Sequence, residues 1–126
     1  GNTLPISRFQ APAYIPDMVK KLEKAMEASK RGLAYQHVFN PCLTGWGIKP
    51  DTSIEVSRLA VETNFFPLYE VEDGKFTITK KFKEPKPLRE YLGRMKKFRH
   101  LNDEEVADIQ QMIDQKWQRL VQLEQL

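Results

Sequence analysis

The side chains with the widest chemical repertoire lie in the stretch HVFNPCLTGW, residues 37–46. Cys42 is the single cysteine of the chain, and His37 is one of its two histidines. A thiolate is both a nucleophile and a metal ligand, and an adjacent imidazole is the base that activates a nucleophilic cysteine. On a regular strand the spacing from 37 to 42 puts the two side chains on opposite faces, although the loop after Phe39 can change direction. A buried structural histidine is therefore the favoured interpretation of His37, and a Cys–His pair stays open.

Motifs that hold a metal or a phosphate are absent. The sequence has no CxxC or HExxH pattern, and its glycine-containing stretches GKFTIT and GWGIKP lack the spacing and context of a phosphate loop. It also lacks the GDG-then-Asn pattern that holds the magnesium and diphosphate of thiamine diphosphate. One cysteine cannot form an internal disulfide, and the first residues do not resemble an export signal, so we expect a reducing, cytoplasmic location.

Residues 80–100 are a basic segment that offers another class of function. Three aromatic residues lie among its lysines and arginines, a combination that single-stranded nucleic acids can use; these are Phe82, Tyr91 and Phe98. We favour a solvated face or an arm across a partner subunit, because acidic residues elsewhere reduce the formal net charge of the chain to +3. A docking patch for an acidic electron carrier is the third interpretation, since electrostatic steering needs only a local basic field.

The bulk properties indicate an ordinary globular protein. The chain has 126 residues, of which 40% are hydrophobic and 29% charged, enough for one domain with a modest core. No window approaches 18 consecutive apolar residues, which excludes a transmembrane helix. The chain opens with Gly1 and not with methionine, so we expect it to be a piece of something longer.

The elements around the cysteine loop form half of an α/β unit. Residues 1–14, with two prolines, are predicted to be an extended arm. Helical spacing then predicts a helix after Pro16 with an apolar stripe for the core, namely Ile15, Met18, Val19, Leu22, Ala25 and Met26. A strand follows at Leu33–Phe39 and ends at the cysteine loop. The stretch Thr52–Glu55 has the pattern of a capping box that would open a second, well-buried helix.

The remaining chain predicts a hairpin and a long helix. Two strand-like segments flank Asp73-Gly74, a strong turn dipeptide, and a short helix starts at Pro87. Asn102 is a good N-cap for a last helix with one apolar stripe: Val106, Ile109, Ile113, Trp117, Leu120 and Leu123. We expect an α/β domain over residues 15–79, and a basic segment with a C-terminal helix over residues 80–126. The stripe of that helix docks either on the chain's own core or on another chain, and we favour a tail that packs on another subunit.

Three stretches together resemble a known family: AYIPDMVKKLEKAMEASKRGLAYQHVFNPCLTGW, TSIEVSRLAVETNFFPLYEVEDGKFTIT and KPLREYLGRMKKFRHL. The chain is similar, from about residue 13 to residue 101, to the C-terminal part of the beta subunit of 2-oxoacid:ferredoxin oxidoreductases, most nearly the pyruvate synthases. The loop PCxTGW followed by AVET-x-x-x-PLYEVE-x-GK is the most specific part of the resemblance. The fold that it implies is the C-terminal fragment of a thiamine-diphosphate-binding α/β fold.

The resemblance also implies an activity and a role for Cys42. The family decarboxylates a 2-oxoacid oxidatively with coenzyme A, uses thiamine diphosphate, magnesium and iron–sulfur clusters, and passes electrons to ferredoxin. Cys42 matches the family's fourth ligand of a four-iron four-sulfur cluster, whose other three ligands lie upstream of the region matched here. This chain alone would then hold none of these cofactors and be inactive. It would act together with other subunits or with the N-terminal part of the same subunit, with neither a membrane nor a nucleic acid as partner.

Overall fold

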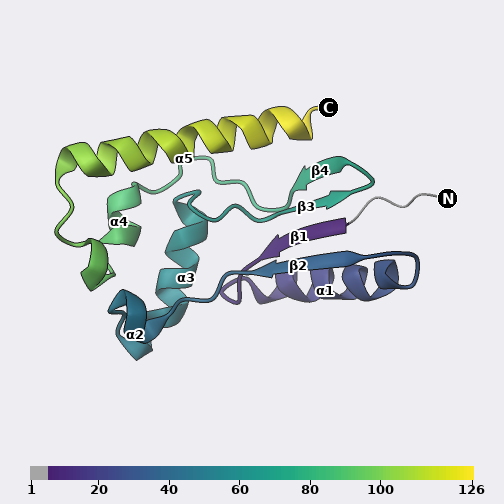
Figure 1. The fold of residues 1–126 in the computed structure, drawn as a ribbon, viewed down its shortest axis with the longest axis horizontal. Helices are drawn as coiled ribbons and strands as arrows, with labels where there is room; N and C mark the ends of the chain where they lie inside the picture. Colours follow the sequence, from purple (N-terminus) through teal and green to yellow (C-terminus); the bar gives the residue numbers. More distant parts are fainter. Residues whose placement is uncertain (1–5) are drawn as a thin grey trace.

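The computed structural model describes residues 6–126. Figure 1 shows a four-stranded sheet between α1 and the C-terminal half of α5, with α2, α3 and α4 at the other end of the molecule. The elements are β1 (Ile6–Gln10), α1 (Ile15–Ser29), β2 (Ala34–Val38), α2 (Leu43–Trp46), the 3-10 turn η1 (Pro50–Thr52), α3 (Ser53–Glu62), β3 (Tyr69–Glu72), β4 (Lys75–Ile78), α4 (Leu88–Leu92), the 3-10 turn η2 (Lys96–Phe98) and α5 (Asp103–Glu124). The predicted α/β class is therefore correct.

Strand β1 lies in the middle of the sheet, whose order is β2-β1-β3-β4. It pairs in parallel with β2, with Ile6 opposite Ala34, and antiparallel with β3, with Arg8 opposite Glu70. The prediction of an extended arm is wrong for these residues, while residues 1–5 lie outside the described range. Five residues near two prolines carry too little pattern to indicate a strand, and the pairing that makes them one comes from distant segments.

The connection between the two parallel strands is helix α1, as a parallel pair requires. Four residues of its apolar stripe stay outside the core: Ile15, Val19, Leu22 and Met26 are between 39% and 71% exposed. Of the stripe, Ala25 is buried, and it faces the sheet together with Lys21 and Ala28. The expectation that the stripe packs on the chain's own core is wrong, because the sheet under α1 presents polar residues.

Charged groups fill the layer between α1 and the sheet. The Lys21 ammonium donates hydrogen bonds of 2.7 Å to the Phe9 carbonyl and of 2.7 Å to the Asp17 carboxylate. Arg8 is 1% exposed, and its Nε lies 3.2 Å from Oε2 of Glu70. Burial lowers the pKa of Lys21 below its ordinary value, against the opposing effect of Asp17. These buried ions occupy the place where the sequence predicts apolar packing.

The hairpin of β3 and β4 forms as predicted. Asp73 and Gly74 both have positive φ, 52° and 75°, as a type I′ turn requires. The predicted capping box at Thr52 does not form, because the Thr52 hydroxyl donates to the carbonyl of Lys49 at 2.8 Å inside the 3-10 turn η1. Helix α3 still starts at the expected place.

The hydrophobic core lies beside the sheet, where α3, α4 and α5 meet (Figure 1). Helix α5 starts at the predicted N-cap Asn102, which forms a capping box with Glu105. At its far end the carboxylate of Glu124 accepts hydrogen bonds from the Ile78 amide and from Lys81, which hold its pKa below the ordinary value. Residues of the core include Val56, Leu59, Ala60, Val61, Leu68, Leu88, Tyr91, Leu92, Met95 and Ile113. Among the helices of residues 6–126, none combines the length and apolar character needed to cross a membrane.

Candidate functional site

The cysteine loop begins at a buried aromatic anchor. Phe39 follows β2 directly, is 7% exposed, and its amide donates to the carbonyl of Gln10 at 2.9 Å. Its ring packs against Trp46 and Phe66, with ring centroids 5.8 Å and 5.2 Å away. Because Phe39 is fixed by both contacts, the loop leaves the end of β2 in one defined direction.

Cys42 occupies the N-cap of the one-turn helix α2. Its Sγ accepts a hydrogen bond from the Gly45 amide at 3.3 Å, and its carbonyl accepts one from the Trp46 amide at 3.0 Å. A Cβ added at Gly45 would lie 3.0 Å from Sγ, so glycine keeps this side of the sulfur open. The cysteine is exposed. The loop therefore presents a thiol to the outside with its backbone conformation held by the turn.

The other end of α2 is fixed by Gly47. Its φ of +65° favours glycine, and an added Cβ would lie 2.7 Å from Cβ of Lys96. The Ile48 amide donates to the carbonyl of Leu43 at 2.9 Å, and the Ile48 side chain is 5% exposed. Both ends of the loop are thus anchored on the core, and η2 lies against it.

His37 is not part of a nucleophilic pair. No hydrogen bond joins it to Cys42 in the described structure, and the histidine is exposed, so the expectation of a buried structural histidine is wrong. Its ring stacks on Phe9 at 4.3 Å between centroids, and Phe9 stacks on Tyr69 at 4.2 Å. This row of rings crosses three strands on one face of the sheet. It was missed because Phe9 lies in the segment predicted to be an arm, where only the alternation in ISRFQ indicates a strand.

Within residues 6–126 no group of three or more histidine, cysteine or acidic side chains is arranged to hold a metal ion. Cys42 is the single cysteine of the chain. A thiolate in this loop can bind one iron of a cluster whose remaining ligands come from elsewhere, and the Gly45 amide is positioned to hydrogen-bond that sulfur.

Comparison with known proteins identifies the relationship. The pyruvate synthase subunit PorB of Methanocaldococcus jannaschii is 49% identical over 104 residues, which are 82% of this chain and 34% of that protein. The ketoisovalerate oxidoreductase subunit VorB of Pyrococcus furiosus is 38% identical over 125 residues, 98% of this chain and 40% of the relative. The beta subunit of NADH-dependent phenylglyoxylate dehydrogenase of Aromatoleum evansii is 46% identical over 103 residues, which are 80% of this chain and 23% of that protein.

The chain is homologous to the beta subunits of 2-oxoacid:ferredoxin oxidoreductases. The resemblance seen in the sequence is thereby confirmed. No protein-family profile matches the chain. The chain spans between 23% and 40% of the length of these three relatives, so it corresponds to a minor part of each.

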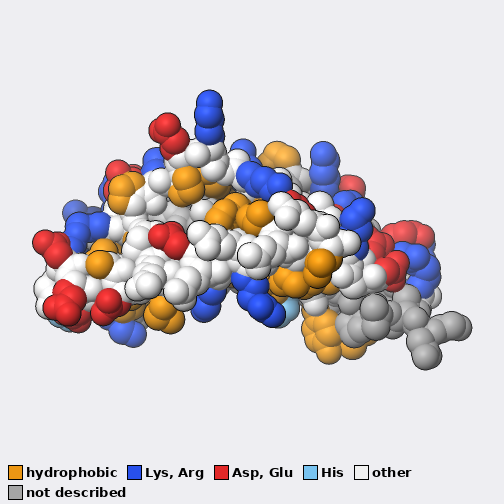
Figure 2. All heavy atoms as spheres, turned by 90° about the horizontal axis from the view of Figure 1, so that it is seen from above, with side chains coloured by type: hydrophobic (Ala, Val, Ile, Leu, Met, Phe, Trp, Pro, Cys, Tyr) orange, Lys and Arg blue, Asp and Glu red, His pale blue; other side chains and the backbone are white. Residues whose placement is uncertain are grey.

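The structure of the basic segment of this beta-subunit homologue does not favour a nucleic-acid surface. Four of its cations are paired within the chain: Lys81 with Glu124, Lys86 with Glu62, Arg89 with Asp103 and Arg94 with Glu55. Tyr91 is only 2% exposed, and Phe82 and Phe98 pack against the core, so no aromatic ring is free to stack a base. Figure 2 shows acidic and basic side chains interspersed on the face seen from the side of α5.

Proposed function

We propose that this chain is a segment of the beta subunit of a 2-oxoacid:ferredoxin oxidoreductase and supplies one ligand of its four-iron four-sulfur cluster. The complete enzyme would decarboxylate a 2-oxoacid oxidatively with coenzyme A and pass the electrons to ferredoxin in the cytoplasm. The observation that carries the proposal is the identity of up to 49% with pyruvate synthase subunits over most of the chain. Pyruvate is the proposed substrate, since a pyruvate synthase subunit at 49% identity stands above the phenylglyoxylate dehydrogenase subunit at 46% and the ketoisovalerate oxidoreductase subunit at 38%.

Cys42 is the residue of this chain that we assign to the cluster. Its exposed sulfur, the open side next to Gly45 and the Gly45 amide hydrogen bond of 3.3 Å all suit a thiolate that binds iron. A cluster of this kind supplies one-electron transfer and needs four ligands. The other three, together with the groups that bind thiamine diphosphate and magnesium, would come from the remainder of the subunit or from other subunits.

Exposed apolar side chains on α1 and around strand β2 support a role as part of a larger assembly. Strand β2 is an edge strand, so one row of its backbone groups is unpaired within the described sheet. Helix α1, which carries the four exposed stripe residues, lies beside β2 in Figure 1. Leu33, just before β2, is 60% exposed, and Tyr35 and Val38 in the strand are each 48% exposed. In our proposal the rest of the thiamine-diphosphate-binding fold adds a strand to β2 and covers α1.

The test is a Cys42→Ser change in the complex that contains this chain. We expect a loss of iron and sulfide, loss of the cluster's electron paramagnetic resonance signal, and a fall of at least about 100-fold in pyruvate- and coenzyme-A-dependent viologen reduction. The circular dichroism of this chain should stay the same, because Cys42 is exposed. A Thr44→Ala change in the same exposed turn is the control and should keep the cluster. Full iron content and activity in the Cys42→Ser complex would refute the assignment.

A further inference from the structure

Three lysines without an ion pair in the described structure lie beside the cysteine loop. Lys49 belongs to the loop itself, and Lys96 and Lys97 form the start of η2. All three are exposed. We call these three residues the lysine patch. Four cations of the basic segment, in contrast, are neutralised by carboxylates of the same chain, namely Lys81, Lys86, Arg89 and Arg94.

The patch is in direct contact with the turn that carries Cys42. A shallow hollow of about 320 Å³ is lined by Gly47, Ile48, Lys49, Pro50 and Lys96. Its glycine caps α2 at the end opposite Cys42, and α2 has four residues, which makes it about 6 Å long at the usual rise. The Lys96 side chain therefore starts at the end of a single helical turn whose other end carries Cys42.

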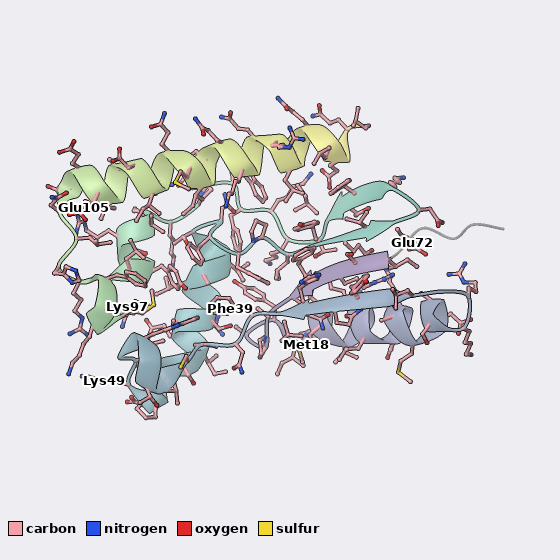
Figure 3. All side chains as sticks on the ribbon, viewed as in Figure 1. Met18, Phe39, Lys49, Glu72, Lys97 and Glu105 are labelled. Carbon is pink, nitrogen blue, oxygen red and sulfur yellow. The ribbon has the colours of Figure 1, made fainter. Side chains whose placement is uncertain are left out.

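The acidic groups around the patch do not cancel its charge. Figure 3 shows Lys49 and Lys97 at the same end of the molecule, with Glu105 at the far edge of that end. Glu55 is engaged by Arg94, which leaves Asp51 as the exposed carboxylate in the adjoining turn η1. Arg99, next to the patch, donates through Nε to the Gly93 carbonyl and has no ion pair in the described structure. The local charge around the cysteine loop is positive.

We propose that the lysine patch docks an acidic electron-carrier protein with its redox centre towards the Cys42 loop. The inference rests on the proposed function, which places a cluster at Cys42. One electron would leave the reduced cluster and enter the oxidised carrier, with no bond formed or broken. A local basic field raises the association rate, and the modest apolar content of the site, with Leu43 at 37% exposed, suits the small interface of a transient redox complex.

A carrier protein fits the patch better than a nucleic acid does. Base stacking needs free aromatic faces, but the Phe98 ring packs against the core and Lys97 lies over it, with Nζ 5.6 Å from the ring centroid. Two lysines that line a hollow, with Lys97 next in the chain, match a compact acidic surface and not an extended phosphate backbone.

The test measures binding of this chain to an acidic two-cluster bacterial-type ferredoxin by biolayer interferometry at 50 and 300 mM NaCl. The triple variant K49E/K96E/K97E should weaken binding about tenfold or more at low salt. Wild-type binding should fall steeply at the higher salt concentration. A control with the same charge change, K20E/K75E/K116E, replaces exposed lysines that line other surfaces and should change the affinity less than about twofold.

Three results would overturn the inference: no ferredoxin binding at low salt, equal weakening by both triple variants, or tighter binding of a single-stranded oligonucleotide through the same three lysines. The neutral variant K49Q/K96Q/K97Q, checked by circular dichroism, separates loss of charge from loss of fold and should lie between wild type and the glutamate variant. Because binding does not need the cluster, a negative result here leaves the Cys42→Ser test of the proposed function unaffected.

Discussion

Replacing Glu70 with glutamine removes one charge from the buried layer under α1 while it keeps the size of the side chain. Glu70 lies beside two cations: Arg8 Nε is 3.2 Å from its Oε2, and Lys24 donates to its Oε1 at 2.8 Å. The side chains of Arg8 and Glu70 are 1% and 9% exposed, whereas that of Lys24 is 53% exposed. The change therefore leaves the Arg8 guanidinium buried with only Glu72, 3.6 Å from its Nη2, as an ionic partner.

Removal of one partner from a buried ion pair costs about 3–5 kcal/mol, since the other charge stays desolvated. The contact with Glu72, which is 42% exposed, offsets part of this, so we expect about 3 kcal/mol for Glu70→Gln. That corresponds to a fall of about 10–15 °C in melting temperature for a chain of this size. Lys24→Gln breaks a contact with the same carboxylate at the surface and should cost less than about 1 kcal/mol.

Urea unfolding followed by circular dichroism at 222 nm measures these free energies. The double variant Arg8→Met/Glu70→Leu replaces the pair with apolar side chains and should recover most of the stability that Glu70→Gln loses. A cost below about 1 kcal/mol for Glu70→Gln, equal to that of Lys24→Gln, would show that water reaches Arg8 and that the charged layer is not buried.

Two further predictions concern the surface of α1 and the alkaline limit of the fold. The chain alone should self-associate through the α1 stripe and the β2 edge. Sedimentation velocity should show less self-association for Val19→Glu, and no change for the control Ile54→Glu at an exposed site on α3. A monomeric wild type would contradict the prediction. Burial raises the pKa of Tyr91 above its unfolded value of 10.0. The contribution of Tyr91 to the free energy of unfolding should therefore be fully present below pH 10 and be lost as the pH rises further, because above pH 10 the tyrosine ionises only in the unfolded chain. Tyr91→Phe should flatten the decline of urea midpoints between pH 10 and 11, and an unchanged slope would refute this.

The sequence indicated most elements correctly where local chemistry decides them. Asp73-Gly74 specifies a turn with two positive φ values, and Asn102 with Glu105 specifies a helix start, whatever the rest of the chain does. The loop around Cys42 was also located correctly at the end of a strand, but its prolines and glycines do not exclude regular structure, because the loop contains the one-turn helix α2 and the turn η1. The role of Cys42 as a cluster ligand stays a prediction, as do the domain boundaries after residue 79.

Non-local contacts decided what the sequence could not. Strand β1 exists because β2 and β3 pair with it on both sides, and its own five residues do not require it. The α1 stripe has the spacing of a core helix, yet the sheet under α1 presents Arg8 and Glu70, so Lys21 turns inwards and the apolar residues turn outwards. Periodicity reports that a helix has two faces, but only the partner surface determines which of them is buried.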